Sequence, residues 1–181
     1  MPVHSASAPL AVRPTADEYA PYYARYVSAV PEGDVLETLE HQIEETVALL
    51  AAVGESRAGH RYAEGKWSVR ELVGHMADAE RIFAYRALCI ARGETASLPG
   101  FDEDAYVAGA DFDARTLNSL LGELTTVRRS TLSLFRNLGD AALARRGTAN
   151  GQSVTVRGIA WIVAGHERHH QQILRERYLA G

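Results

Sequence analysis

Residues 156–179 read VRGIAWIVAGHERHHQQILRERYL, and their apolar side chains recur at the three- and four-residue spacing of an amphipathic helix. With His166 set at zero and about 100° of rotation per residue, the apolar residues fall between roughly −40° and +80°. His170 falls at about +40°, inside this apolar stripe, whereas His169 falls at about −60°, at its edge. The segment therefore predicts a helix that carries His166 and His170 toward a protein core, one turn apart.

A second helix is predicted from Ser68 to about Arg92. Ser68 is a good N-cap, and Glu71 three residues later completes a capping box. When His75 is set at zero, the apolar residues of this helix also fall between roughly −40° and +80°. A third imidazole is therefore expected to face the core from a different helix.

Two further amphipathic patterns predict helices at about Val35–Val53 and Ala114–Leu138, and a shorter helix is expected within residues 17–27. The connection from Glu94 to Asp113 is longer than a tight turn between helices, which indicates a crossover. No alternating pattern of convincing length predicts a strand, and the polar cluster at residues 147–153 is interpreted as a turn. We expect an all-α four-helix bundle with one long crossover connection.

Length and composition fit one globular domain. The chain has 181 residues, of which 46% are hydrophobic and 23% charged, and its formal net charge is −4. Residues 1–15 show no periodicity and are predicted to be a flexible N-terminal arm, with the bundle domain at residues 16–181. The acidic balance disfavours nucleic acid and anionic membranes as partners, and no apolar run is long enough to cross a bilayer. A single cysteine and no secretory signal favour the cytoplasm.

Three inward histidines predict a site for one divalent metal ion. His75, His166 and His170 would supply three ligands from two helices and leave coordination positions open for water or substrate. The alternative is that each is a hydrogen-bonded core residue, which would require a separate buried partner for each imidazole. The pairing of the two helices is an assumption at this point. The remaining histidines outside the last helix have no partner at ligand spacing and are interpreted as structural or solvated: His4, His41 and His60.

A second motif involves the same residues. His166–His170 matches H-E-x-x-H, the zincin protease signature in which Glu167 would be the general base. Too few residues follow His170 for the downstream helix that normally brings the third ligand, and the metzincin extension is absent. Glu167 also projects about 100° from His166, away from the centre of the stripe. These features disfavour a protease.

Two stretches around the histidines resemble the DinB/YfiT-like superfamily. They are residues 66–81, KWSVRELVGHMADAER, and residues 165–170, GHERHH. Residues 99–104 and 127–129 also resemble the family, and the likeness extends over about residues 17–179. The resemblance implies a four-helix bundle with a long crossover and one divalent metal ion. Carried over residue by residue, its ligands would be His75, His166 and His170.

The resemblance also implies classes of chemistry. Reported metals in the family include nickel and zinc, and imidazole ligands suit either. Some relatives are thiol S-transferases that use bacillithiol or mycothiol, and one branch isomerises maleylpyruvate with mycothiol. Others are described as metal-dependent hydrolases, in which water would be the nucleophile. The implied partners are a small-molecule substrate, a low-molecular-weight thiol and a second copy of the chain in a homodimer, without DNA. A non-enzymatic binding or stress protein with a structural metal stays open as the alternative.

Several other side chains could assist such a site. Arg86 projects inward at about +20° from His75. It could bind a substrate carboxylate, but a salt bridge inside the bundle with Glu44 or Glu45 is the preferred interpretation. The acidic residues near the histidines could orient the ligands or be solvated; they are Asp78, Glu80 and Glu167. We expect His169 to form hydrogen bonds instead of binding metal. Packing roles are expected for Trp67, Trp161 and Cys89.

Overall fold

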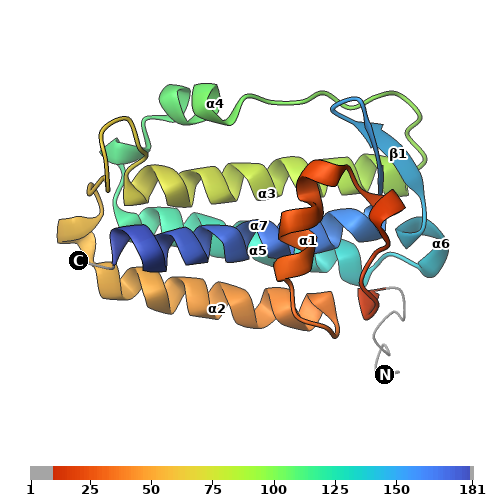
Figure 1. The fold of residues 1–181 in the computed structure, drawn as a ribbon, viewed down its shortest axis with the longest axis horizontal. Coiled ribbons are helices and arrows are strands. Elements are labelled where there is room, and N and C mark those ends of the chain that lie inside the picture. The colour runs from red at the N-terminus through yellow and green to blue at the C-terminus, as the bar shows by residue number, and fades with distance from the viewer. Residues whose placement is uncertain (1–9, 180–181) are drawn as a thin grey trace.

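The structure, a computed structural model, describes residues 10–179 and is dominated by helices (Figure 1). The four long helices are α2 (Val35–Val53), α3 (Val69–Ala91), α5 (Leu117–Arg136) and α7 (Val156–Ile173). The shorter elements are α1 (Ala24–Ala29), α4 (Glu103–Ala110), α6 (Asp140–Leu143), β1 (Arg146–Ala149) and β2 (Gln152–Thr155). The prediction of an all-α four-helix bundle is confirmed, apart from one small hairpin.

Side-chain caps set the ends of the long helices. The Ser68 hydroxyl accepts a hydrogen bond from the Glu71 amide, and the Glu71 carboxylate accepts one from the Ser68 amide, as the capping box predicts. Helix α5 begins at Leu117, later than the predicted Ala114, because the Thr116 side chain caps it. Helix α7 ends at Ile173 and continues as a π-helical turn, Leu174–Tyr178.

The bundle has a diagonal arrangement. Helices α2 and α3 follow one another in sequence but each packs against α5 and α7, and Figure 1 shows α2 and α3 on opposite sides of that pair. Helices α3 and α5 run in the same direction, so residues 92–116 must return along the whole length of the bundle before α5 can begin (Figure 1). This segment is the predicted crossover, and it contains α4.

An antiparallel hairpin lies at the end of the bundle where the crossover leaves α3 (Figure 1). Strands β1 and β2 are joined by Asn150 and Gly151, which both have positive φ, the combination typical of a tight hairpin turn. Backbone hydrogen bonds of 2.9 Å join Leu98 of the crossover to Thr148 and Asn150. The turn predicted within residues 147–153 is present at Asn150-Gly151, but the strands on either side of it were not predicted. The hairpin fixes the start of the crossover.

The core consists of two apolar clusters with a polar layer between them. One cluster takes the C-terminal part of α3 and the N-terminal part of α7, whereas the other takes the opposite halves of these helices. Buried polar side chains from all four long helices lie between the clusters: Gln42, Thr46, His75, Glu80, Arg128, Thr131, His166, Glu167, His170 and Gln171. A polar layer at mid-bundle is costly unless its groups are paired or bind a ligand, so this layer marks the candidate site.

The N-terminal segment packs on this bundle where the structure describes it. Leu10 is fully buried, and the Arg13 guanidinium donates hydrogen bonds to the carbonyl oxygens of Val27 and Val30. Residues 1–9 of the predicted arm lie outside the described residues. The short helix expected within residues 17–27 is replaced by 3-10 turns followed by α1. None of the described helices has the length and hydropathy needed to span a membrane.

Candidate metal centre

The three predicted ligands come together in the polar layer. His166 and His170 lie one turn apart on α7, and His75 faces them from α3, which packs directly against α7. All three side chains are buried, with exposed fractions of 2% for His75, 7% for His166 and 6% for His170. Among the described residues, these three histidines form the cluster that could hold a metal ion.

The distances suit a single ion. The Nε2 atom of His166 lies 3.1 Å from Nε2 of His75 and 3.1 Å from Nε2 of His170. Two nitrogens bound to one metal at about 2.0–2.1 Å lie about 2.9 Å apart at a right angle and about 3.3 Å apart at the tetrahedral angle. The observed separations fall between these values, so the imidazoles need little movement to bind one ion.

The imidazoles are in the protonation state that metal binding requires. Burial lowers the pKa of His75 to about 4. Burial, together with the neighbouring histidines, lowers the pKa values of His166 and His170 well below 6.5. All three rings are therefore neutral near pH 7, with lone pairs available for a metal. The second ring nitrogen of His170, Nδ1, is buried without a hydrogen-bond partner among the described residues.

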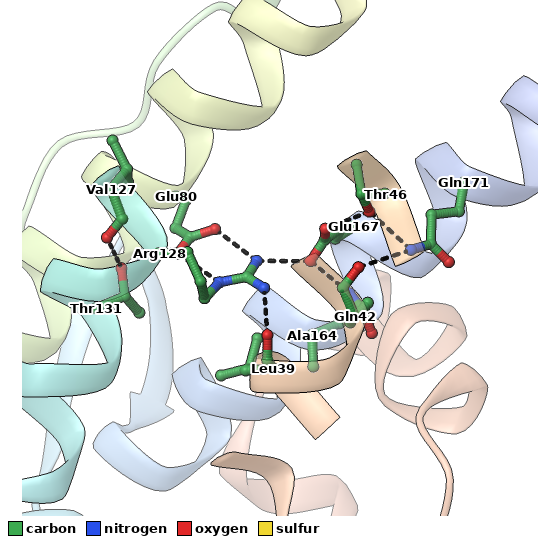
Figure 2. A network of polar contacts seen from close by, with 10 residues as sticks. All are labelled: Leu39, Gln42, Thr46, Glu80, Val127, Arg128, Thr131, Ala164, Glu167 and Gln171. Atoms are coloured by element: carbon green, nitrogen blue, oxygen red, sulfur yellow. Dashed lines mark hydrogen bonds and ion pairs between the residues drawn. The ribbon is translucent and has the colours of Figure 1, made fainter. Parts of the chain in front are cut away.

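A network of buried polar contacts holds α7 in place beside the histidines (Figure 2). Arg128 donates two hydrogen bonds to the Glu80 carboxylate, at 2.9 and 2.7 Å, and one to Glu167, at 2.6 Å. Glu167 also accepts hydrogen bonds from Gln42, at 2.7 Å, and Thr46, at 2.5 Å. Because these residues come from all four long helices, the network fixes the rotation of α7 and with it the direction of His166 and His170.

This network determines the role of Glu167. Both of its carboxylate oxygens are engaged by Arg128, Gln42 and Thr46, so neither is directed at the histidines as a zincin general base would require. Glu80 is likewise paired with Arg128. Sequence reasoning did not assign a role to Arg128, Gln42 or Thr46. The available signal for Arg128 was its place beside Val127 on the apolar stripe of the third helix and within the family-like stretch 127–129.

The histidine cluster borders a cavity of about 410 Å³. His166 lines it directly, and five aromatic side chains form part of its wall: Tyr22, Tyr23 and Tyr26 from the N-terminal segment, Phe83 from α3, and Phe101 from the crossover. The volume lies within the range of small-molecule sites. The ligand set is thus open on the side of the cavity, unlike a structural zinc site closed by four protein ligands.

Glu103, at the start of α4, brings a carboxylate to this opening. Its Oε2 atom lies 3.9 Å from Nε2 of His75, and the side chain is about half exposed, at 54%. Burial raises the pKa of Glu103, and the nearby carboxylates of Asp104 and Asp102 add to this, whereas Arg25 opposes it. Sequence reasoning missed Glu103 because only the return of the crossover along the bundle places α4 over α3.

Most of the other residues singled out in the sequence pack against neighbouring side chains or form ion pairs, and they do not join the histidine cluster. The ring of His169 packs at 5.3 Å from the Tyr26 ring, outside the ligand cluster. Trp67 packs at 4.7 Å from the His75 ring, and Trp161 is fully buried in the core. Asp78 pairs with Arg81 on the same helix, 3.3 Å away.

The structure also gives the positions of three further residues considered in the sequence analysis. His41 is exposed on α2, and the ring of His60 lies 6.2 Å from the Tyr178 ring. Cys89 is a free, partly buried cysteine. His4 lies outside the described residues.

Arg86 does not form the expected salt bridge. Among the described residues, neither Glu44 nor Glu45 pairs with it, and its guanidinium instead donates a hydrogen bond to the Pro99 carbonyl oxygen at 2.7 Å. Glu44 and Glu45 lie on α2, whereas Arg86 is near the far end of α3, where the hairpin and crossover meet. The diagonal arrangement of α2 and α3 keeps these side chains apart.

The four-helix bundle, in which α2 and α3 lie diagonally, and its buried cluster of three histidines place this protein in the class of helical bundles with a candidate metal site. The family model of the DinB superfamily matches residues 38–174, and the chain belongs to this superfamily.

Individual relatives agree with this assignment. The chain is 26% identical over 137 residues to a protein of Oceanobacillus iheyensis named "putative metal-dependent hydrolase", which covers 75% of this chain and 76% of the relative. The fold of this chain matches that of YfiT from Bacillus subtilis, which is described as "a probable metal-dependent hydrolase with an unusual four-helix bundle topology". The TM-score is 0.68 at 19% identity, over 91% of this chain and 92% of YfiT. A mycothiol-dependent maleylpyruvate isomerase shares the fold with a TM-score of 0.65 at 15% identity, over 80% of this chain and 61% of the isomerase.

Proposed function

We propose that this protein is a metal-dependent enzyme that binds one divalent ion through His75, His166 and His170 and activates a small nucleophile for attack on a substrate in the adjoining cavity. Hydrolysis, with water as the nucleophile, is the favoured reaction. The observation that carries the proposal is the convergence of three neutral imidazoles at the wall of a cavity of about 410 Å³, with Nε2 of His166 3.1 Å from Nε2 of His75 and of His170. A bound ion would supply Lewis acidity and lower the pKa of a coordinated water or thiol.

The residues of the chain divide the remaining work. The three imidazoles would hold the ion, and the buried network of Arg128, Glu80 and Glu167 fixes the direction of the two on α7. Glu103 would accept the proton that the nucleophile loses, because its carboxylate faces His75 across the open side and burial raises its pKa. The aromatic wall would exclude water from the rest of the substrate.

The nucleophile could also be a low-molecular-weight thiol, and this is the finer version of the proposal. Water is supported by the relative that is named as a hydrolase, and a thiol is supported by the fold shared with a mycothiol-dependent isomerase. The same site is compatible with both nucleophiles. We further propose that the protein acts in the cytoplasm, where such thiols are abundant, and as a homodimer. Nickel and zinc are the proposed metals, because both accept imidazole ligands.

The first experiment measures the metal content of the purified protein by elemental mass spectrometry. We expect about one equivalent in the parent and almost none in a His166→Ala, His170→Ala double variant. His169→Ala is the matched control, since this neighbour lies outside the cluster and should leave the metal in place. If the parent binds no metal even after nickel or zinc is added, the three histidines are core residues and the proposal is wrong.

The second step separates the reaction classes in the metal-loaded protein. Ester and amide substrates are assayed without thiol, and electrophilic substrates are assayed with candidate thiols. Turnover only in the presence of thiol would replace hydrolysis by thiol transfer. Bound metal without turnover in either panel would favour the non-enzymatic binding protein.

A further inference from the structure

Arg86 is a buried cation on the wall of the cavity. It is 4% exposed, and its guanidinium lies 5.9 Å from the ring centres of both Phe83 and Phe101. The guanidinium donates a hydrogen bond to the Pro99 carbonyl oxygen at 2.7 Å and interacts with the neutral Tyr23 hydroxyl, whereas the Nε atom is buried without a partner among residues 10–179. Within the same residues, no carboxylate forms an ion pair with it. A guanidinium buried without a counterion is costly, because its charge is removed from water without compensation.

The acidic groups near the cavity do not neutralise this charge. Asp102 accepts a hydrogen bond from the Ala105 amide and caps α4. Glu103 faces His75, where a bound metal would attract it. The other nearby cation, Arg25 of α1, donates its hydrogen bonds to the Tyr22 and Tyr26 hydroxyls. Arg86 is therefore the charge in this cavity that still requires an anion.

The cavity places such an anion beside the histidines. Phe83 lies between the two features, with its ring 5.8 Å from the His166 ring and 5.9 Å from the Arg86 guanidinium. The side chains of Asn150 and Gln152 in the hairpin line the same space and offer further hydrogen bonds. One small molecule can therefore contact Arg86 at one end and the histidine cluster at the other, with its body on Phe83.

We propose that Arg86 is the binding residue for a carboxylate group of the substrate, and that the substrate class is a small carboxylic acid with an apolar or aromatic body. The planar guanidinium matches a carboxylate bidentately, and the aromatic wall suits the apolar body. The role of this molecule as substrate rests on the function proposed above, whereas its binding at Arg86 does not require the metal.

The test compares two probes of the same shape, the anion 3-phenylpropanoate and its neutral amide, 3-phenylpropanamide, by isothermal titration calorimetry. The metal-free protein is titrated first, because a carboxylate could otherwise bind to the ion itself. We expect the acid to bind at least about tenfold more tightly than the amide, by the strength typical of a charge-assisted hydrogen-bonded pair. The metal-loaded protein should retain this preference.

Variants assign the preference to one side chain. Arg86→Gln should abolish it, and Arg86→Lys, which keeps the charge but loses the bidentate geometry, should retain only part of it. Arg81→Gln is the control, because Arg81 lies on the same helix but pairs with Glu123 and Asp78 at the surface. Metal content and thermal unfolding of each variant show whether the metal site and the fold are intact.

Each outcome decides the proposal. Equal binding of acid and amide by the parent would overturn it, even if Arg86→Gln failed to fold. An Arg86→Gln variant that still prefers the acid would overturn it as well. Inorganic phosphate that displaces the acid at equal concentration would assign the site to phosphate esters and remove the carboxylate class. Because the titration of the metal-free protein is independent of the metal analysis, failure of this proposal and failure of the proposed enzyme are distinguishable.

Discussion

At the scale of single residues, Arg128 should contribute most to stability among the polar side chains. It is fully buried, and although burial opposes its charge, Glu167 and Glu80 outweigh that effect and raise its pKa. Arg128→Met would leave two buried carboxylates without their cation, so we expect a loss of about 3–5 kcal/mol in the free energy of unfolding. Urea unfolding followed by circular dichroism measures this loss.

Arg136→Met is the matched control for that variant. Arg136 lies on the same helix, but it pairs with Glu40 where both side chains are nearly half exposed, at 47% and 44%. Water screens this pair, and we expect a loss below about 1 kcal/mol. Equal losses for the two variants would show that the buried network contributes no more than a surface ion pair.

The residue scale also shows how far the sequence alone could lead. His166 and His170 were predictable, because two imidazoles four residues apart on an apolar stripe must share a face. Their neighbour Glu167 occupies the position of a zincin base, a role that the sequence already disfavoured, and the contacts from α2 and α5 show that it is a structural anion. The partner of Arg86 could not be predicted for the same reason. The expected salt bridge with Glu44 or Glu45 required α2 and α3 to be neighbours, which the sequence does not show.

At the scale of elements, the crossing of α1 over α7 depends on Gly165. A Cβ atom at this position would overlap the backbone carbonyl of Tyr26, and backbone cannot move aside as a flexible side chain can. Gly165→Ala should therefore displace α1 and cost about 1–3 kcal/mol of unfolding free energy, the usual price of overpacking. The displacement would also move the Tyr26 ring, which packs 5.7 Å from the His166 ring and lines the cavity. Thermal unfolding and probe binding measure the two effects.

Gly122→Ala is the control for this crossing. Gly122 lies inside α5 with no atom within 4 Å of a Cβ placed on it. Alanine favours the helix over glycine by about 0.8–1.0 kcal/mol, so this variant should gain stability where Gly165→Ala loses it. A loss of similar size in both variants would contradict the close approach of α1 and α7.

The hairpin is the element that the sequence did not reveal. Its turn, Asn150-Gly151, is a strong hairpin signal. However, the flanking strands have only four residues each and lack the alternation of apolar and polar residues that identifies a strand. Their stability comes from tertiary contacts instead, since Leu98 of the crossover pairs with the hairpin and Gly147 packs closely against Ile90. Such contacts are invisible to reasoning based on local patterns.

At the scale of the whole molecule, the crossover determines which helices meet. The sequence predicted four helices and one long connection, but it did not predict that α3 and α5 run in the same direction or that α2 and α3 lie diagonally. That arrangement brings all four helices to one polar layer and closes the cavity with the N-terminal segment. The site is thus a product of topology, and its residues are spread from Gln42 to Gln171.

The stability of the metal-free protein should therefore depend on pH through the buried histidines. His75 has its pKa lowered to about 4 in the folded state, compared with 6.5 for the unfolded chain, so the unfolded chain binds more protons between these values. Stability is full above pH 6.5 and is lost as the pH falls through this window. For His75 alone the expected loss between pH 7 and pH 5 is about 2 kcal/mol. Measurement uses urea unfolding of chelator-treated protein at the two pH values.

His75→Gln should reduce the difference between pH 7 and pH 5, whatever its effect on stability at either pH. His41→Gln removes an exposed imidazole on α2 and is the control for the substitution itself. Because His166 and His170 are also buried and neutral, part of the pH dependence should persist in His75→Gln. A parent protein that is equally stable at both pH values would mean that the imidazoles reach water in the folded state, which would remove the physical basis for three neutral ligands at mid-bundle.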